Sequence, residues 1–190
     1  MKHISVWLLS VFLTLSLISF AHAEGNTGVP ETIRVLLDSR AHRSLLDEPV
    51  RQEDLDVIIA CGLRSPSAVN AQPWHFTVVK NREIADEIIG FDINGVVIVI
   101  SVLPGSGLSD LDELVSVFDC GLATQAMYTA AQALGLGANI YWLPAIAHEA
   151  LVIPDGYRVL MVMIVGHVDM DTVSFATGRN GAEMMVDYIN

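Results

Sequence analysis

The chain has 190 residues, 52% of them hydrophobic and 17% charged, which suits one globular domain with a substantial apolar core. Its formal charge of −12 repels phosphate backbones and anionic lipid, so composition gives no support to nucleic acid or a membrane surface as a partner. Because cations are scarce, the places where arginines gather are informative.

The first 23 residues are organised like a secretory signal peptide. Lys2 gives a positive start, residues 4–20 form an uncharged apolar run, and Ala21-His22-Ala23 is a small-x-small cleavage site. We expect cleavage after Ala23, which leaves residues 24–190 as one domain in the periplasm or outside the cell. The alternative is an uncleaved anchor, since the apolar run is nearly long enough to span a bilayer.

Helix and strand patterns alternate along the rest of the chain. Helical spacing of apolar residues predicts helices over 31–40, 51–64, 81–89, 109–134 and 147–151. Strand patterns cover 74–79, 95–102, 140–143 and 157–168, and the second and fourth are continuous apolar runs typical of strands buried on both faces. This order predicts an α+β or mixed α/β fold.

The most distinctive stretch lies between the second helix and the first strand. Residues 65–76 read Ser-Pro-Ser-Ala-Val-Asn-Ala-Gln-Pro-Trp-His-Phe, and their prolines, serines and amides indicate a loop. The loop is polar although it connects two elements that must both be buried, and such loops often hold small ligands. Trp74, at its end, is interpreted as a core residue.

The pattern Pro66-Ser67-x-x-Asn70-x-Gln72-Pro73-Trp74 resembles the flavin-binding loop of the nitroreductase family. The resemblance extends to Arg40-Ala41-His42-Arg43, Asp119-Cys120-Gly121, Leu134-Gly135-Leu136-Gly137, Ile164-Val165-Gly166 and Gly178-Arg179. It covers most of the chain after residue 23, and the order and spacing make it specific. It implies a three-layer sandwich with a central sheet flanked by helices, bound FMN, and a homodimer with two FMN sites at the subunit interface.

The resemblance also implies a set of cofactor-binding residues: Arg40, Ala41, Arg43, Pro66, Ser67, Ala68, Asn70, Gln72, Gly135, Gly137 and Arg179. Arginine suits the phosphate because its planar guanidinium matches phosphate oxygens, and Arg40 and Arg43 would share a face on a helical turn. The amides of Asn70 and Gln72 donate and accept, as the pyrimidine edge and ribityl chain require. The segment 135–141 would complete the region near the reactive ring nitrogen.

Two readings compete with this assignment. By themselves, the arginines would be taken for solvated surface residues and the amides for residues that close a turn. Ala41 also stands where the family usually has Ser, which removes a hydroxyl from the phosphate site.

The helical Cys61 and Cys120 are expected to be free thiols, although an oxidising compartment would permit a disulfide.

The flavin itself performs hydride transfer, so the resemblance implies an FMN-dependent oxidoreductase without a catalytic side chain. Electrons would pass from NAD(P)H to a small nitroaromatic or quinone acceptor. No metal is expected, because His42, His75, His148 and His167 lack metal-ligand spacing. The alternatives are another flavin reaction on the same fold, such as dehalogenation, azoline formation or flavin cleavage, and a non-catalytic flavin carrier. The sequence leaves the donor and the acceptor open.

Overall fold

The computed structural model describes residues 29–105, 112–142, 150–169 and 178–189. Its helices are α1 (Glu31–Asp38), α2 (Gln52–Leu63), α3 (Arg82–Ile89), α4 (Asp112–Ala133) and α5 (Ala182–Met185), with a single 3₁₀ turn, η1 (Ala68–Asn70), in the described part. The strands β1 (Trp74–Val79), β2 (Val96–Val102), β3 (Gly137–Tyr141) and β4 (Arg158–Gly166) form an antiparallel sheet in the order β1-β2-β4-β3.

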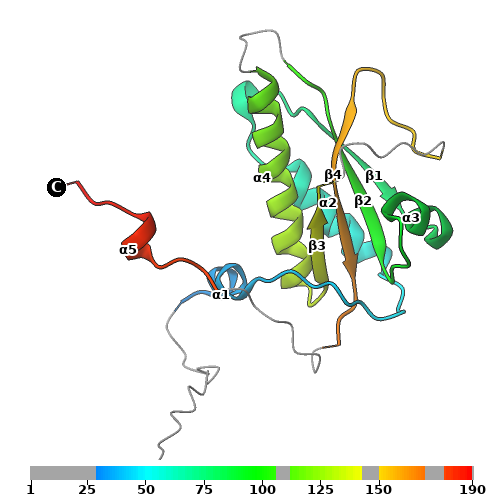
Figure 1. Ribbon diagram of the computed structural model, residues 1–190, viewed down its shortest axis with the longest axis horizontal. Helices are drawn as coiled ribbons and strands as arrows, with labels where there is room; N and C mark the ends of the chain where they lie inside the picture. Colours follow the sequence, from blue (N-terminus) through cyan, green and yellow to red (C-terminus); the bar gives the residue numbers. More distant parts are fainter. Residues whose placement is uncertain (1–28, 106–111, 143–149, 170–177, 190) are drawn as a thin grey trace, which may run out of the picture.

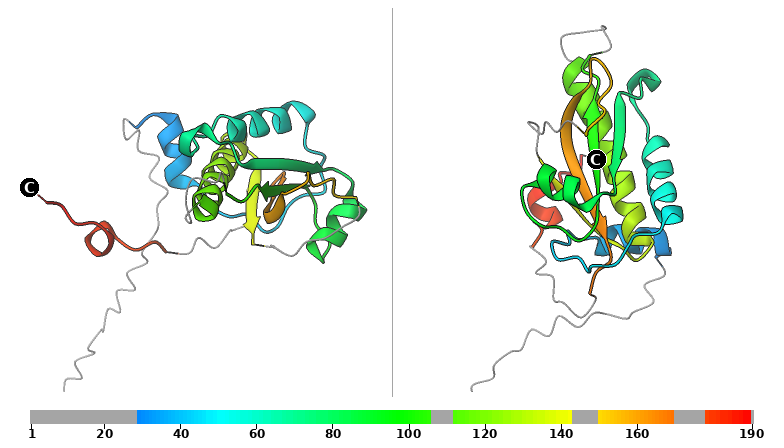
Figure 2. Two further views of the ribbon diagram at one scale, coloured as in Figure 1. Left: turned by 90° about the horizontal axis from the view of Figure 1, so that it is seen from above. Right: turned by 90° about the vertical axis from the view of Figure 1, so that its right-hand side faces the viewer.

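Helices cover both faces of this sheet, as the predicted three-layer sandwich requires (Figures 1 and 2). α2 and α4 lie on one face, and α3 lies on the other. All seven residues of β2 are buried, because alternate side chains enter the two cores: Ile98 and Ile100 face α2 and α4, whereas Val97 and Val99 face α3. The fold class predicted from the sequence is therefore confirmed, and Trp74 is a core residue, as predicted.

The long helix α4 ends in a tight turn that feeds directly into β3. Gly135 has φ +77°, a left-handed conformation that costs glycine little. Its N–H donates to the Gln132 carbonyl, and the N–H of Leu136 donates to the Ala131 carbonyl, which together form a Schellman motif. The turn places the end of α4 beside the start of β3.

Several element boundaries differ from the predicted ones. β3 begins at Gly137 rather than Ile140, because pairing with β4 extends it through residues of weak strand propensity. α1 ends at Asp38, so Arg40 lies outside the helix. The predicted turn of helix at 147–151 is not helical at residues 150 and 151, and its other residues lie outside the described part. The helix α5 was not predicted.

Two further expectations concern the cysteines and the N-terminus. Cys61 and Cys120 are both free thiols, as predicted. The predicted signal peptide lies outside the described residues. Within the described ranges, no helix is both long and apolar enough to cross a membrane.

Candidate functional site

The first half of the predicted site is an extended strip, residues 40–46, here called the arginine segment. It crosses the ends of β3 and β4: the His42 N–H donates to the Ala138 carbonyl (2.9 Å), and the Leu46 N–H donates to the His167 carbonyl (2.8 Å). The segment is not helical, so the expectation that Arg40 and Arg43 share the face of a helical turn is wrong.

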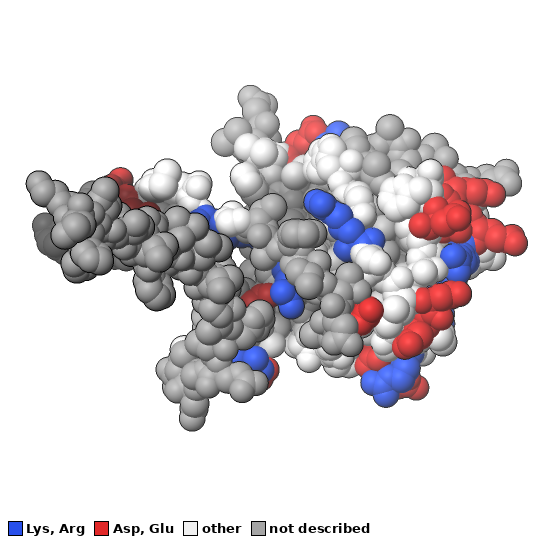
Figure 3. All heavy atoms as spheres, turned by 60° about the horizontal axis from the view of Figure 1, so that its bottom comes forward, with Lys and Arg blue, Asp and Glu red and all other residues white. Residues whose placement is uncertain are grey.

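The backbone of Arg40 is held by a side chain at the end of α4. The Gln132 amide accepts from the Arg40 N–H (3.1 Å) and donates to the Arg40 carbonyl (3.0 Å). One amide thus satisfies both backbone groups of the residue that begins the arginine segment. Figure 3, which brings the lower end of Figure 1 forward, shows Lys and Arg side chains set singly in the surface, while acidic side chains gather along one edge.

Gly137 lets the arginine segment lie close to β3. A Cβ added to Gly137 would overlap Val168 Cγ1 and lie 2.8 Å from His42 Cβ and 3.0 Å from His42 Cγ. No side chain fits without moving the segment, so the glycine is required by close approach rather than by its backbone conformation.

His42 stands between Arg40 and Arg43 in the sequence. Burial, and then the charge of Arg40, lower the pKa of His42 below its ordinary value. Its Nδ1 is buried without a hydrogen-bond partner. The lowered pKa favours the neutral imidazole beside the charge of Arg40.

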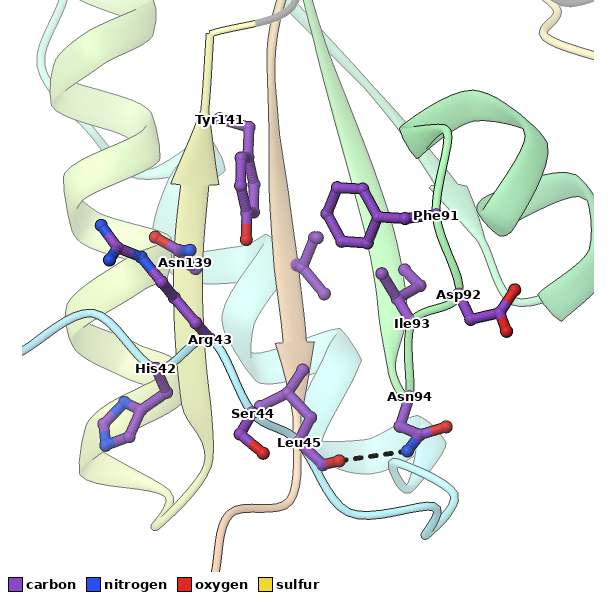
Figure 4. A pocket seen from close by; sticks show the side chains of 11 residues that line it. His42, Arg43, Ser44, Leu45, Phe91, Asp92, Ile93, Asn94, Asn139 and Tyr141 are labelled. Atoms are coloured by element: carbon purple, nitrogen blue, oxygen red, sulfur yellow. Dashed lines mark hydrogen bonds between the residues drawn. The ribbon is translucent and has the colours of Figure 1, made fainter. Parts of the chain in front are cut away.

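Beside the arginine segment, on the α3 side of the sheet, lies a cavity of about 180 Å³ (Figure 4). Ile93 and Ile164 form part of its apolar wall, and Phe91 and Tyr141 meet edge to face across it with ring centroids 6.1 Å apart. Figure 4 shows the Arg43 side chain running past Asn139. The cavity therefore combines flat apolar walls with a guanidinium and an amide.

Asn139 is the most deeply buried polar side chain of this cavity, with 7% of its surface exposed. Its Oδ1 accepts from the Ile140 N–H (3.0 Å), which orients the amide. The Asn94 amide donates to the Leu45 carbonyl (3.2 Å), while its own Oδ1 is buried without a partner. Asn94 thus ties one side of the cavity to the arginine segment, whereas the Asn139 bond is local to β3.

The second half of the predicted site, the 65–73 loop, is strained. Val69, Asn70 and Gln72 have φ values of +47°, +59° and +48°. Such backbone costs about 1–3 kcal/mol per residue and is unusual for a β-branched side chain. Val69 is also 77% exposed, so packing within this chain does not offset the strain at that residue.

α4 holds this loop from the side. Asp119 is buried, and its two carboxylate oxygens accept from the Ala68 N–H at 3.2 and 3.1 Å. Within the loop, Ser67 Oγ accepts from the Gln72 N–H (3.0 Å). The loop is thus fixed near the start of α4, whereas the arginine segment is fixed near its end.

One chain therefore brings only part of the predicted set together. Asp119 and Gln132 are thirteen positions apart on α4, which separates their attachment points by roughly 20 Å along the helix axis. Arg40, Ala41, Arg43 and Gly137 lie at one end with Gly135 nearby. Pro66, Ser67, Ala68, Asn70 and Gln72 lie at the other.

Arg179 belongs with the arginine end. Burial raises the pKa of Tyr128, while a hydrogen bond with Gln132 and the charge of Arg179 oppose that rise. Arg179 thus lies within electrostatic reach of the same stretch of α4 that holds Arg40. Gly178 and Arg179 are both exposed.

Four residues shape the site in ways that sequence patterns did not predict. Asp119 stood in a matched motif and Asn139 in the segment 135–141, but neither had an assigned role. Gln132 and Asp119 act across 92 and 51 positions of the chain, so no local pattern indicates their partners. Phe91 and Asn139 line the cavity from a loop and from a strand. An Asn among the buried residues of β3 was the one usable signal, because buried polar side chains need a partner.

Comparisons with known proteins agree with this architecture. Residues 37–103 and 105–167 match the model of the nitroreductase family. A protein of Methanothermobacter thermautotrophicus, named "Putative NADH dehydrogenase/NAD(P)H nitroreductase", is 33% identical over 122 residues, or 62% of this chain and 63% of that protein. This chain thus spans less than two thirds of that relative. The Bacillus subtilis FMN reductase is 29% identical over 165 residues, or 72% of this chain and 66% of that enzyme.

The solved structure of a nitroreductase with bound FMN from Bacteroides fragilis has the same fold. It superposes with a TM-score of 0.71 at 17% identity and covers 85% of this chain and 100% of that one. The family inferred from the loop and the arginine segment is thereby confirmed. Because the family model matches well over half of its residues, this chain belongs to the nitroreductase family.

Proposed function

We propose that the protein is an FMN-dependent oxidoreductase that passes electrons from a reduced nicotinamide to a small acceptor such as a nitroaromatic or a quinone. The observation that carries this proposal is the arginine segment lying against β3 beside a cavity with aromatic walls and a polar side. Family membership and the names of the FMN reductase relative and the FMN-bound structure support it. When bound, the flavin supplies the hydride chemistry.

The residues present fit FMN. Arg40, Arg43 and Arg179 supply cations for a phosphate at one end of the molecule, and Ala41 supplies no hydroxyl there. The cavity of about 180 Å³ is smaller than typical ligand pockets of roughly 300–1,000 Å³, so one copy offers apolar walls and amide groups to only part of the cofactor. The guanidinium of Arg43 favours any negative charge held beside it. The protein's own residues bind FMN, orient it and shield it from solvent.

We propose that two copies complete the site. A two-fold axis perpendicular to α4 near its middle turns one copy end for end against the other. The 65–73 loop of each copy then comes beside the arginine segment of its partner. The dimer therefore has two complete sites, each built from the loop of one copy and the arginine segment of the other. This arrangement explains why the predicted residues occupy opposite ends of α4.

An apolar stripe on α4 suits that contact. Leu114, Phe118 and Leu122 follow one another at intervals of four, and each has at least half of its side chain exposed, with 64% for Phe118. Leu122 lies at the middle of α4. Such a stripe on a helix indicates a surface that another element covers.

The C-terminal residues present a second apolar surface. α5 and the residues after it stand apart from the sheet and its helices in Figures 1 and 2. Their exposed side chains include Met184, Met185, Tyr188 and Ile189, and Ile189 is 98% exposed. A second copy is the occupant that the composite site requires, and these residues would add to the contact.

A charge placed in the stripe tests the composite site. Phe118→Asp should convert a dimer into monomers that no longer retain FMN, because a carboxylate at the interface loses its hydration. Val152→Asp, at an exposed valine in the loop before β4, is the matched control. Both would be measured by light scattering coupled to gel filtration. A dimeric, flavin-bound Phe118→Asp protein would contradict the proposed contact.

Turnover decides between an enzyme and a flavin carrier. The missing hydroxyl at Ala41 favours the carrier, the second candidate. The enzyme reading predicts that the FMN-loaded protein oxidises NADPH faster when nitrofurazone or a quinone is added. A loaded protein that stays at the background rate with both acceptors would leave only the carrier function or another flavin reaction.

We also propose that the chain is exported. The signal-peptide pattern of residues 1–23 supports this, and the test is the N-terminal sequence of the protein recovered from cells that express the full chain. A mature start at Glu24 in the periplasmic or secreted fraction is expected. A chain that begins at Met1 in the cytoplasm would contradict it.

A further inference from the structure

The strained 65–73 loop needs a restraint, and α4 supplies one. Val69, Asn70 and Gln72 all hold left-handed backbone, which the unrestrained loop would leave for ordinary conformations. Ser67 and Gln72 bond to each other within the loop. Among the described residues, the only side chain from another element bonded to residues 67–72 is Asp119 of α4.

Asp119 is placed for this task and for no other that the described residues reveal. It is 5% exposed, and both of its oxygens face the N–H of Ala68, the first residue of η1. The first N–H groups of a helical turn have no partner within the turn, and a carboxylate is a strong acceptor for them. The bond fixes the point from which the left-handed residues project.

We propose that Asp119 is a positioning residue, whose bond to Ala68 keeps the 65–73 loop in the shape that presents Ser67 and Asn70 to FMN. The inference rests on the proposed function, because the loop is taken to reach a flavin. Asp119 is not among the residues proposed to contact the cofactor. Its effect passes entirely through the loop.

Substitutions at Asp119 separate positioning from general stability. Asp119→Ala should weaken FMN binding about tenfold or more, the value of a charge-assisted hydrogen bond. Asp119→Asn keeps one carbonyl acceptor and should restore most of the affinity. Thr124→Val is the matched control: Thr124 is a buried polar residue of the same helix whose hydroxyl bonds only to the Cys120 carbonyl, and FMN affinity should not change.

A loop variant removes the same bond without touching the core. Ala68→Pro deletes the N–H, and Ser67 already has the extended backbone (φ −142°, ψ 154°) that a following proline requires. Its loss of affinity should match that of Asp119→Ala, and combining the two should add little. This variant decides the question if Asp119→Ala fails to fold.

FMN affinity would be measured by quenching of FMN fluorescence, and the restraint by hydrogen exchange at the Ala68 amide. We expect slow exchange in the wild type and fast exchange in Asp119→Ala. A folded Asp119→Ala or Ala68→Pro protein that binds FMN within about twofold of wild type would overturn the inference. If the wild type binds no FMN, the proposed function fails, and the Ala68 exchange rate alone decides whether Asp119 restrains the loop: equal rates in both proteins refute it.

Discussion

Gly137→Ala tests the contact on which the arginine segment depends. The new Cβ would overlap Val168 Cγ1 and lie 2.8 Å from His42 Cβ, well inside van der Waals contact. Val168 Cγ1 is the end of a side chain, but His42 Cβ moves only with the backbone of residues 40–46. Overpacking of this kind typically costs about 1–3 kcal/mol.

Two measurements follow from that displacement. A domain of this size loses roughly 2–4 °C of Tm per kcal/mol, so Tm should fall by roughly 2–12 °C. FMN binding should weaken about fivefold if misaligned arginine donors lose ~1 kcal/mol. Calorimetry and fluorescence titration measure the two effects.

Gly178→Ala is the matched control, because a Cβ there meets no atom within 4 Å. It should leave both Tm and affinity unchanged. If Gly137→Ala is as stable as wild type and binds FMN equally well, the close approach of the arginine segment to β3 is refuted.

Three further predictions concern single side chains. Arg43→Ala should weaken FMN binding about tenfold or more, because it removes a charged donor beside the cavity. Arg82→Ala, the control, removes the same charge from surface ion pairs with Asp47 and Asp86 and should leave the affinity unchanged. The lowered pKa of His42 means that the unfolded chain takes up a proton at a higher pH than the folded one does. The free energy of unfolding should therefore fall as pH drops below about 6.5. Denaturant titrations should show this fall in wild type and a smaller fall in His42→Gln. Burial, and then the charge of Asp119, raise the pKa of Cys120 to about 12. A thiol reagent at pH 8 should therefore label at most Cys61 in the native protein and both cysteines after unfolding. Rapid labelling of Cys120 in the native protein would contradict its burial.

Local patterns were enough to predict the elements whose sequence and burial agree. β2 is a β-branched run buried on both faces, and α2 repeats its apolar residues at helical spacing, so both lie close to their predicted bounds. β3 was misplaced because Gly137 and Ala138 have little strand propensity and become a strand only by pairing with β4. The exposed helix α5 buries no apolar face against a core, so the sequence has no helical spacing of apolar residues from which to predict it.

The candidate site divides in the same way. Its loop and arginines were predicted because short motifs carry them. The bonds of Gln132 and Asp119 were not predicted, because each side chain acts on a backbone group far away in the sequence. The separation of the two half-sites could not be predicted either, since it follows from the length of α4 between its two attachments rather than from any motif.

The composite FMN site is tested most directly by gel filtration of residues 24–190 after loading with FMN, with absorbance and light scattering recorded together. We expect flavin absorbance to elute with protein at the mass of a dimer, in an amount equimolar to the chain. Protein that elutes colourless, or flavin that stays with a monomer, would contradict a cofactor site built by two copies.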